Sequence, residues 1–267
     1  FSFYFLFKGL HTKKYYPFIL AGIFFGLGIH TYVAFRVAPL ILIILFLVLL
    51  IVYQNFPRKF WKQILIFAFF AGLVASPILV DFYLNPEHFS SRTEAISVFS
   101  PQVNQGNLFT MLVKNIGLSL GKYTFFGDQN WRHNYPPYPI LDPITGLSFF
   151  VGLIYLFVKI IQLAYLRFKY KIRDEKLVIY VFLASWLFVM LIPEFLSSEG
   201  LPHALRSIGT MPAVIIITLL PFLWILGKVN QLGIFTRISV ISLLFFALIF
   251  LGLFNTIKYF VFFLFYY

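Results

Sequence analysis

A histidine and an arginine follow a proline in residues 193–212 (PEFLSSEGLPHALRSIGTMP). His203 and Arg206 are three residues apart, so they share one face of a helix that starts near Pro202. The free N–H groups and the dipole at a helix N-terminus favour an anion, and a guanidinium is a two-pronged donor matched to phosphate. The spacing therefore predicts a phosphate site in which His203 and Arg206 face a cavity. The residues alone allow two alternatives, which are a pairing of Arg206 with a nearby glutamate and a contact with lipid headgroups.

A second polar segment, residues 127–143 (GDQNWRHNYPPYPILDP), combines charged side chains with aromatic rings. Its four prolines and the lack of an apolar period exclude a regular helix. Arg132 and His133 stand beside Trp131 and Tyr135, and this mixture suits a sugar, which has an apolar ring face and a hydroxyl rim. The alternative is an ordered loop that caps the ends of neighbouring helices.

A third segment, residues 26–36 (GLGIHTYVAFR), ends in Arg36. Gly26 and Gly28 allow close contact with another helix. A second apolar run follows almost at once, so a tight hairpin is predicted here. A buried arginine in such a hairpin needs a carboxylate or a bound anion as its partner, and a lipid headgroup is the alternative.

The composition decides what kind of structure must hold these residues. Of the 267 residues, 61% are hydrophobic and only 11% are charged, and cysteine is absent. Soluble domains are nearer ~45–50% apolar and ~25% charged. Water-soluble enzymes, disordered chains and disulfide scaffolds are therefore excluded. The apolar runs are continuous, without the alternation of an outer-membrane barrel, so the predicted fold class is an all-α polytopic transmembrane helical bundle.

Seven apolar runs are long enough to be complete spans, and the boundaries that they predict are 16–35, 37–53, 62–82, 145–166, 176–193, 203–227 and 235–254. The apolar residues 1–7 add a partial span, which indicates a fragment that lacks an N-terminal part. We therefore expect a single membrane domain over residues 1–267, with a long loop at 83–144. An amphipathic stretch at 107–122 predicts a helix that lies in the membrane interface, and a helix packed on the outer face is the alternative.

Charge divides the connections between these spans into two sets. Fourteen basic and two acidic residues fall on one side, whereas seven basic and seven acidic residues fall on the other. The positive-inside rule makes the basic side cytoplasmic and the long loop extracytoplasmic, in a multi-pass protein of the plasma (inner) membrane. The net charge of +12 is then a topology signal, and nucleic acid is not an expected partner.

Several motifs are absent from the sequence. It has no GxxxxGK loop, no HExxH and no GxSxG, and its five histidines are scattered. Neither ATP-driven transport nor a zinc site gains support from these patterns.

The three polar segments, GLGIHTYVAFRVAPL, GDQNWRHNYPPYPILDPITG and PEFLSSEGLPHALRSIGTMP, together resemble bacterial polytopic glycosyltransferases of the GT-C superfamily. The nearest branch is the one related to protein O-mannosyltransferases and aminoarabinose transferases, and the resemblance covers about residues 17–227. It implies an inverting transfer of a hexose or pentose from a polyprenyl-phosphate donor to an acceptor glycan, lipid or protein, on the extracytoplasmic side.

The resemblance also implies which residues bind the donor and line the cavity, namely Arg36, Arg132, His133, His203 and Arg206. The acidic catalytic residue of the family lies on the first outer loop, before the start of this chain, so no catalytic base is assigned and the isolated chain is expected to be inactive. No metal ligand is assigned, although a divalent metal is used by many relatives.

A multi-pass transporter or flippase for a lipid-linked or anionic solute is the alternative function. Pro77, Pro212 and Pro221 can break helices as such proteins require, but most of the charge lies at helix ends, away from the middle of the membrane. A purely structural membrane subunit is a third reading.

Overall fold

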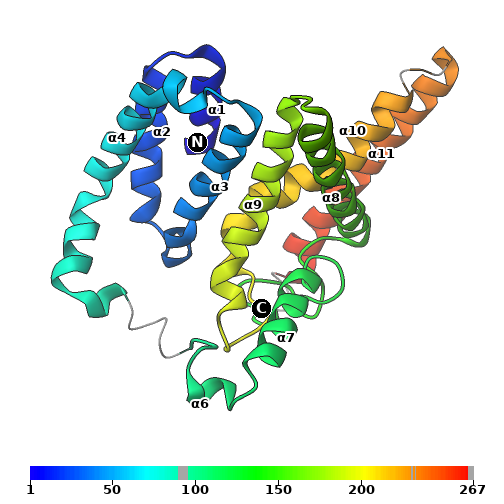
Figure 1. Ribbon diagram of the computed structural model, residues 1–267. Helices are drawn as coiled ribbons and strands as arrows, with labels where there is room; N and C mark the ends of the chain where they lie inside the picture. The colour runs from blue at the N-terminus through cyan, green and yellow to red at the C-terminus, as the bar shows by residue number, and fades with distance from the viewer. Residues whose placement is uncertain (90–95, 230, 232, 264–267) are drawn as a thin grey trace.

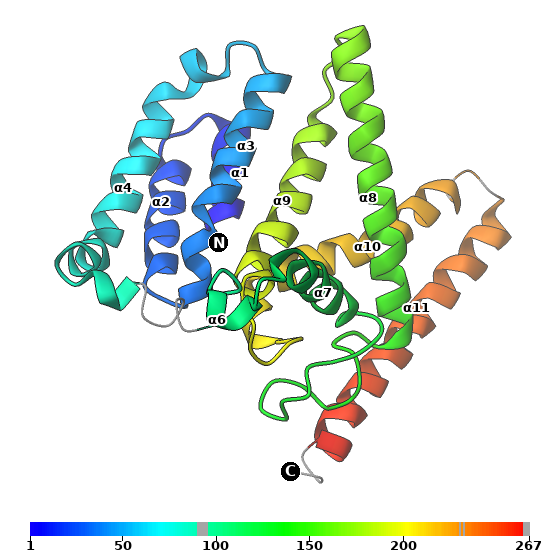
Figure 2. The same ribbon diagram turned by 60° about the horizontal axis from the view of Figure 1, so that its bottom comes forward.

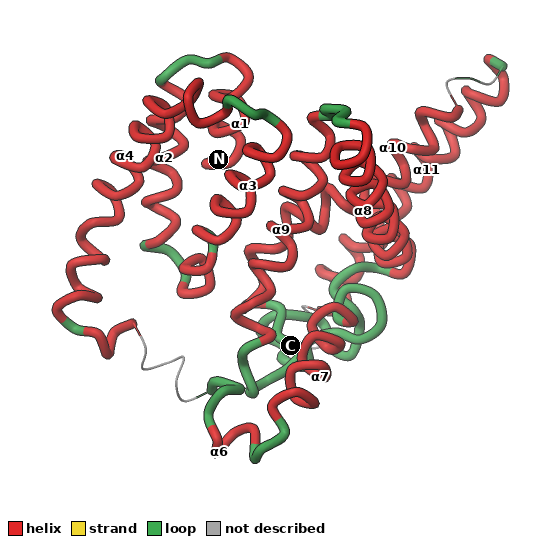
Figure 3. Tube along the Cα trace, in the orientation of Figure 1, coloured by secondary structure: helices red, strands yellow, loops and turns green. Residues whose placement is uncertain are grey.

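The computed structural model describes residues 1–89, 96–229, 231 and 233–263, and helices dominate it (Figures 1 and 3). Within these ranges, the only β pairing is one antiparallel bridge between Ser97 and Ser197. The helices are α1 (Ser2–Thr12), α2 (Tyr16–Ile29), α3 (Pro39–Val52), α4 (Phe56–Leu84), α6 (Pro101–Asn104), α7 (Leu108–Gly121), α8 (Pro143–Tyr170), α9 (Glu175–Phe195), α10 (Met211–Val229) and α11 (Ile234–Ile257), with short turns η1 (Val33–Val37), η2 (Leu205–Thr210) and η3 (Lys258–Phe263). The predicted all-α class is confirmed.

Six of the described helical segments are long and apolar enough to cross a membrane, which supports a multi-pass membrane protein. They are Val33–Val52, Phe56–Leu84, Pro143–Tyr170, Glu175–Phe195, Leu205–Val229 and Ile234–Val261. Each overlaps one of the last six predicted spans. The predicted count of seven is not confirmed.

The first predicted span, 16–35, is wrong as a single helix. Helix α2 ends at Ile29 after 14 residues, about 21 Å of helix against the ~30 Å of a bilayer core. The Thr31 hydroxyl donates to the Gly28 carbonyl at 2.6 Å, and Tyr32 is extended, so the helical hydrogen bonding stops. The ring of Phe35 then folds back onto Gly28, where a Cβ would leave it no room. These local contacts override the apolar pattern that favours a longer helix.

Helices α1–α4 form one group and α8, α10 and α11 another, with α9 between them (Figures 1 and 2). One face of α9 contributes Phe182 and Met190 to a core shared with α1–α4, and another contributes Leu187 and Leu191 to a core shared with α8 and α10. The close helix contact predicted from glycine is confirmed in the first group. A Cβ on Gly26 would lie 2.7 Å from the Ala71 carbonyl oxygen of α4, whereas Gly28 faces the ring of Phe35.

The connections between helices lie at two ends of the bundle (Figure 1). One end, called the basic end below, carries the short connections 13–15, 53–55 and 171–174. The other, called the loop end, carries the connections 30–32 and 196–204 and the long connection between α4 and α8, which includes α6 and α7. Residues 90–95 of the long connection, and with them Arg92 and Glu94 of the charge count, lie outside the described residues.

The helix predicted at 107–122 is present as α7. Polar residues of this helix face the rest of the protein, and apolar residues face outward. Asn115 and Ser119 are buried, whereas Phe109, Val113 and Ile116 are exposed. The Asn115 amide donates to the carbonyl oxygens of Phe195 and Ser197, at 3.0 and 2.8 Å, and so satisfies the end of α9. An apolar face directed outward fits a helix at the membrane interface, and that location stays a prediction.

Candidate functional site

The Asp128 carboxylate joins the two predicted polar segments at the loop end. Asp128 is 2% exposed. Its Oδ1 accepts the backbone N–H of Asn130 at 2.8 Å, which shapes the turn that follows. Its Oδ2 accepts the backbone N–H of Ala204, also at 2.8 Å, across 76 residues of chain. A single side chain therefore fixes segment 127–143 against segment 193–212.

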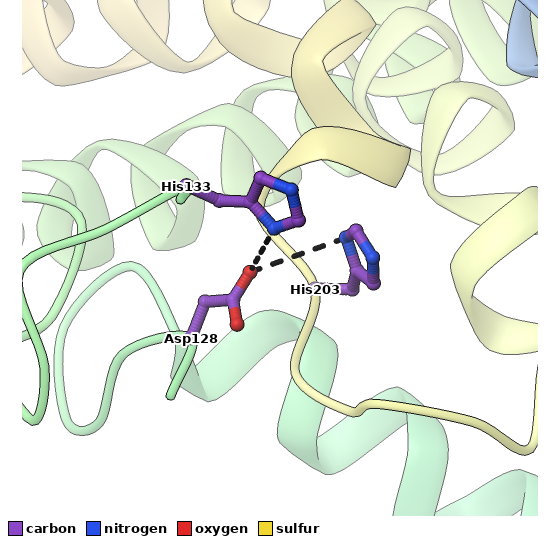
Figure 4. Close-up of side chains that lie close together, drawn as sticks. All are labelled: Asp128, His133 and His203. Carbon is purple, nitrogen blue, oxygen red and sulfur yellow. Dashed lines mark hydrogen bonds and ion pairs between the residues drawn. The ribbon is translucent and has the colours of Figure 1, made fainter. Parts of the chain in front are cut away.

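Two histidines converge on this carboxylate, one from each segment (Figure 4). The Nδ1 atom of His133 lies 3.2 Å from Asp128 Oδ2, and the Nδ1 atom of His203 lies 4.0 Å from it. The two imidazoles stack with their centroids 4.7 Å apart. Their hydrogen bonds orient them, because His203 Nδ1 also accepts the backbone N–H of Arg206 at 3.3 Å.

The charge state of His203 follows from this environment. Burial lowers the pKa of His203, and the positive charge of Arg206 lowers it further, while Asp128 opposes both effects. A neutral His203 is consistent with an Nδ1 that accepts a hydrogen bond. Sequence reasoning placed His203 on the face of a regular helix, and this is wrong. The chain reaches Leu205 before it becomes helical, and it does so as the tight turn η2, so His203 caps the turn from outside.

Asp128, His133 and His203 are also a donor set that fits a divalent metal. One carboxylate oxygen and two imidazole nitrogens lie within 4.8 Å of one another. Two histidines and a carboxylate on one face are a recurring ligand set for divalent transition metals. A bound ion would add positive charge at this junction. The five histidines are scattered in the sequence, and only the fold brings these two together.

A fully buried ion pair contacts the same junction and stabilises it. Lys122, directly after α7, and Glu194, at the end of α9, are both 0% exposed and pair with each other. The second oxygen of Glu194 accepts the backbone N–H of His203 at 2.9 Å, and the Lys122 ammonium also donates to the hydroxyl of Ser207. Burial lowers the pKa of Lys122, and the Glu194 carboxylate opposes that shift. The pair therefore holds the backbone of the segment that presents His203.

Segment 127–143 is ordered and packed on the helices, as its prolines and aromatic rings predict. The N–H of Ile140 donates to the Lys122 carbonyl at 2.9 Å. The rings of Tyr135 and Tyr138 stack at 5.3 Å. Asp142 caps α8 through the N–H groups of Ile144 and Thr145, both at 3.1 Å. These contacts confirm the alternative of an ordered loop that caps neighbouring helices, and sugar binding by this segment stays a prediction.

A pocket of about 590 Å³ opens beside this junction. Its polar side chains come from the 127–143 loop, the end of α11 and the start of η3. Its apolar side chains come from the same loop, from η2 and from the start of α10. The polar lining includes Arg132, His133, Asn134, Tyr135, Asn255 and Lys258, and the apolar lining includes Ile140, Leu205, Ile208 and Met211. Two cationic groups therefore stand next to an apolar surface.

Two of the predicted site residues turn elsewhere. Arg206 donates to the Ser197 hydroxyl, and its guanidinium lies 3.8 Å from the Glu199 carboxylate. Neither Arg206 nor His203 lines the pocket, so the prediction that both face one cavity does not hold for it. The pairing of Arg206 with a glutamate, which the sequence allowed, is the one observed. Arg36 donates to the Phe89 carbonyl at 3.0 Å and stacks over Phe82. Its partners are a backbone oxygen and aromatic rings, and it does not join the Asp128 cluster.

Sequence reasoning missed the roles of several residues. Asp128 belongs to a segment whose other residues point to a site, and Lys122 and Glu194 belong to no motif. Lys258 lies on a helix more than a hundred residues from Arg132 and shares no motif with it. A weak signal was available for Lys122 and Glu194, because each sits next to an apolar helix end where an unpaired charge is costly.

No protein-family model, curated protein or solved structure matches this chain.

Proposed function

We propose that this chain belongs to a membrane glycosyltransferase that uses a polyprenyl-phosphate sugar as its donor and acts on the extracytoplasmic side. The loop-end pocket is the observation that supports this most. Such a donor has an anionic phosphate, a sugar and an apolar chain, and the pocket offers a matching surface for each. Arg132 and Lys258 provide positive charge, Tyr135 an aromatic ring, and Leu205 with Ile208 an apolar wall.

The chemistry assigns a role to each group. When the bond between the anomeric carbon and the phosphate oxygen breaks, negative charge grows on the departing phosphate. Arg132 and Lys258 stabilise that charge electrostatically. His133, oriented by Asp128, donates to or accepts from a sugar hydroxyl. The acceptor hydroxyl needs a general base, and we assign none of the described residues to that role.

Arg206 then has a positioning role. Its contacts to Ser197 and Glu199 hold the 193–212 segment, and we assign the phosphate to Arg132 and Lys258 instead. The transporter alternative is less favoured. It needs interrupted helices near the middle of the membrane, whereas α4 and α10 run through Pro77 and Pro221 without a break.

The test is donor binding by the purified chain in detergent, followed by tryptophan fluorescence because Trp131 adjoins Arg132. We expect a short-chain polyprenyl phosphate to bind, and Arg132→Ala to weaken binding about 10-fold or more, since a hydrogen bond to a charged group contributes roughly 1.5–3 kcal/mol. Arg237→Ala, at the basic end, is the matched control and should leave binding unchanged. Equal loss in both variants, or equal binding of the unphosphorylated polyprenol, would remove the support for this donor.

A further inference from the structure

A second cavity, of about 730 Å³, lies at the basic end and takes no part in the proposed donor site. It is enclosed by the last turns of α1 and α3, the first turns of α4 and the start of α9. Its floor is apolar and includes Leu49, Phe56 and Val178, each less than a tenth exposed. The volume is within the roughly 300–1,000 Å³ that small-molecule sites occupy.

The rim of this cleft is positively charged. Lys13, Lys59 and Arg173 line it together with His11. Within the described residues, no carboxylate lies within 4.0 Å of the charged nitrogens of the two lysines or the arginine. Arg173 donates to the Gln54 side-chain oxygen at 2.7 Å, which holds its guanidinium in place.

The single acidic residue of the lining already has a partner. The hydroxyl of Tyr53 hydrogen-bonds Glu175, and burial together with this carboxylate raises the pKa of Tyr53 to about 12. Tyr53 is therefore a neutral donor to Glu175 at ordinary pH. The lining therefore holds three cationic side chains, Lys13, Lys59 and Arg173, against one carboxylate, and its net charge is positive.

We infer that this cleft binds an anionic phospholipid of the surrounding leaflet, with the headgroup phosphate on the rim and the start of an acyl chain on the apolar floor. Basic pockets between membrane helices bind anionic headgroups in this way, and a guanidinium binds phosphate through two parallel hydrogen bonds. The apolar floor favours a lipid over free phosphate, because inorganic phosphate leaves that surface in water. The inference is independent of the proposed donor site, which lies at the opposite end of the bundle.

Native mass spectrometry of the purified chain in micelles tests this inference. Phosphatidylglycerol and phosphatidylethanolamine are added at equal concentration, and the bound lipid is counted. We expect retention of phosphatidylglycerol, and a loss of about 10- to 30-fold in its apparent affinity for the double variant Lys59→Ala/Arg173→Ala, since each basic residue contributes about fivefold. The matched control is Lys169→Ala/Lys228→Ala, which removes two charges from the same end of the protein outside the cleft and should keep binding.

Two further measurements distinguish lipid binding in the cleft from attraction to the general surface charge. Ile179→Trp fills the cleft without a change of charge and should also reduce lipid retention. Inorganic phosphate in excess should not displace the lipid. Equal losses in the cleft and control double variants, unchanged binding to Ile179→Trp in a folded chain, or displacement by free phosphate would each overturn the inference.

Discussion

The charged residues that hold the loop end together are buried, whereas those at the basic end are mostly exposed, with Arg167 as a buried exception that donates to the Ile51 carbonyl. At the loop end, Lys122 and Glu194 are completely buried and paired, and Asp128 is almost completely buried. At the basic end, Lys13 and Lys59 are exposed and outside any ion pair among the described residues. A buried charge is tolerated only where a partner compensates its desolvation. The buried charges of the loop end therefore position the backbone, whereas the exposed lysines of the basic end are free to interact with groups outside the protein.

The lengths of the connections explain the difference. At the basic end the chain turns within a few residues, so few backbone groups need a partner there. At the loop end, segments 127–143 and 193–212 are irregular, and their N–H groups are satisfied by carboxylates. Asp128 and Glu194 accept the adjacent N–H groups of Ala204 and His203. In these irregular segments the buried carboxylates accept backbone N–H groups that carbonyl oxygens would accept within a helix.

Breaking the buried ion pair should have the largest effect. Lys122→Met leaves Glu194 buried without its cation, and the expected loss in the free energy of unfolding is about 3–5 kcal/mol. Thermal unfolding in detergent measures it. Lys114→Met removes an exposed lysine of α7 and should change stability by no more than about 0.5 kcal/mol. The double variant Lys122→Met/Glu194→Gln should recover part of the loss, and similar stability of the two lysine variants would contradict the comparison.

The Asp128 cluster should give an intermediate effect. Asp128→Ala leaves the N–H groups of Asn130 and Ala204 without their acceptor, at about 1–3 kcal/mol for a buried group. Asp128→Asn keeps one acceptor oxygen and should cost less.

Titration with Co²⁺ tests metal binding by the Asp128 cluster separately. Coordination predicts visible absorption bands in the wild-type chain and none in His133→Ala, and a spectrum without bands would leave the cluster as a hydrogen-bonded junction alone.

The smallest expected effect concerns Asp142 and pH. Burial raises the pKa of Asp142, but hydrogen bonds from Thr145, Asn255 and Ile144 outweigh it and hold the pKa below its usual 3.8. The stability that this carboxylate contributes is then fully present above pH 3.8 and is lost as the pH falls through the lowered pKa. Asp142→Asn removes the titration, so the difference from wild type should shrink in acid. A constant difference across that range would show that the charge of Asp142 contributes no pH-dependent stability, because asparagine is an equally good N-cap.

The sequence by itself determined the all-helical class and the approximate position of the last six apolar spans, because continuous apolar runs and helix propensity are local properties. It also singled out the two segments that meet at the loop end, but without predicting their contact, and it singled out segment 26–36, whose Arg36 lies elsewhere. Proline content, aromatic rings and polar residues mark segments 127–143 and 193–212 without any knowledge of the fold.

Only the tertiary structure decided which side chains within those segments meet. Arg206 reaches Glu199 instead of the pocket because the chain enters η2 after a non-helical stretch, so the helical spacing used to place it with His203 does not apply. Lys122 and Glu194 pair across 72 residues. Such pairs depend on the path of the backbone through α7 and α9, and a pattern of period 3.6 carries no information on contacts between segments so far apart.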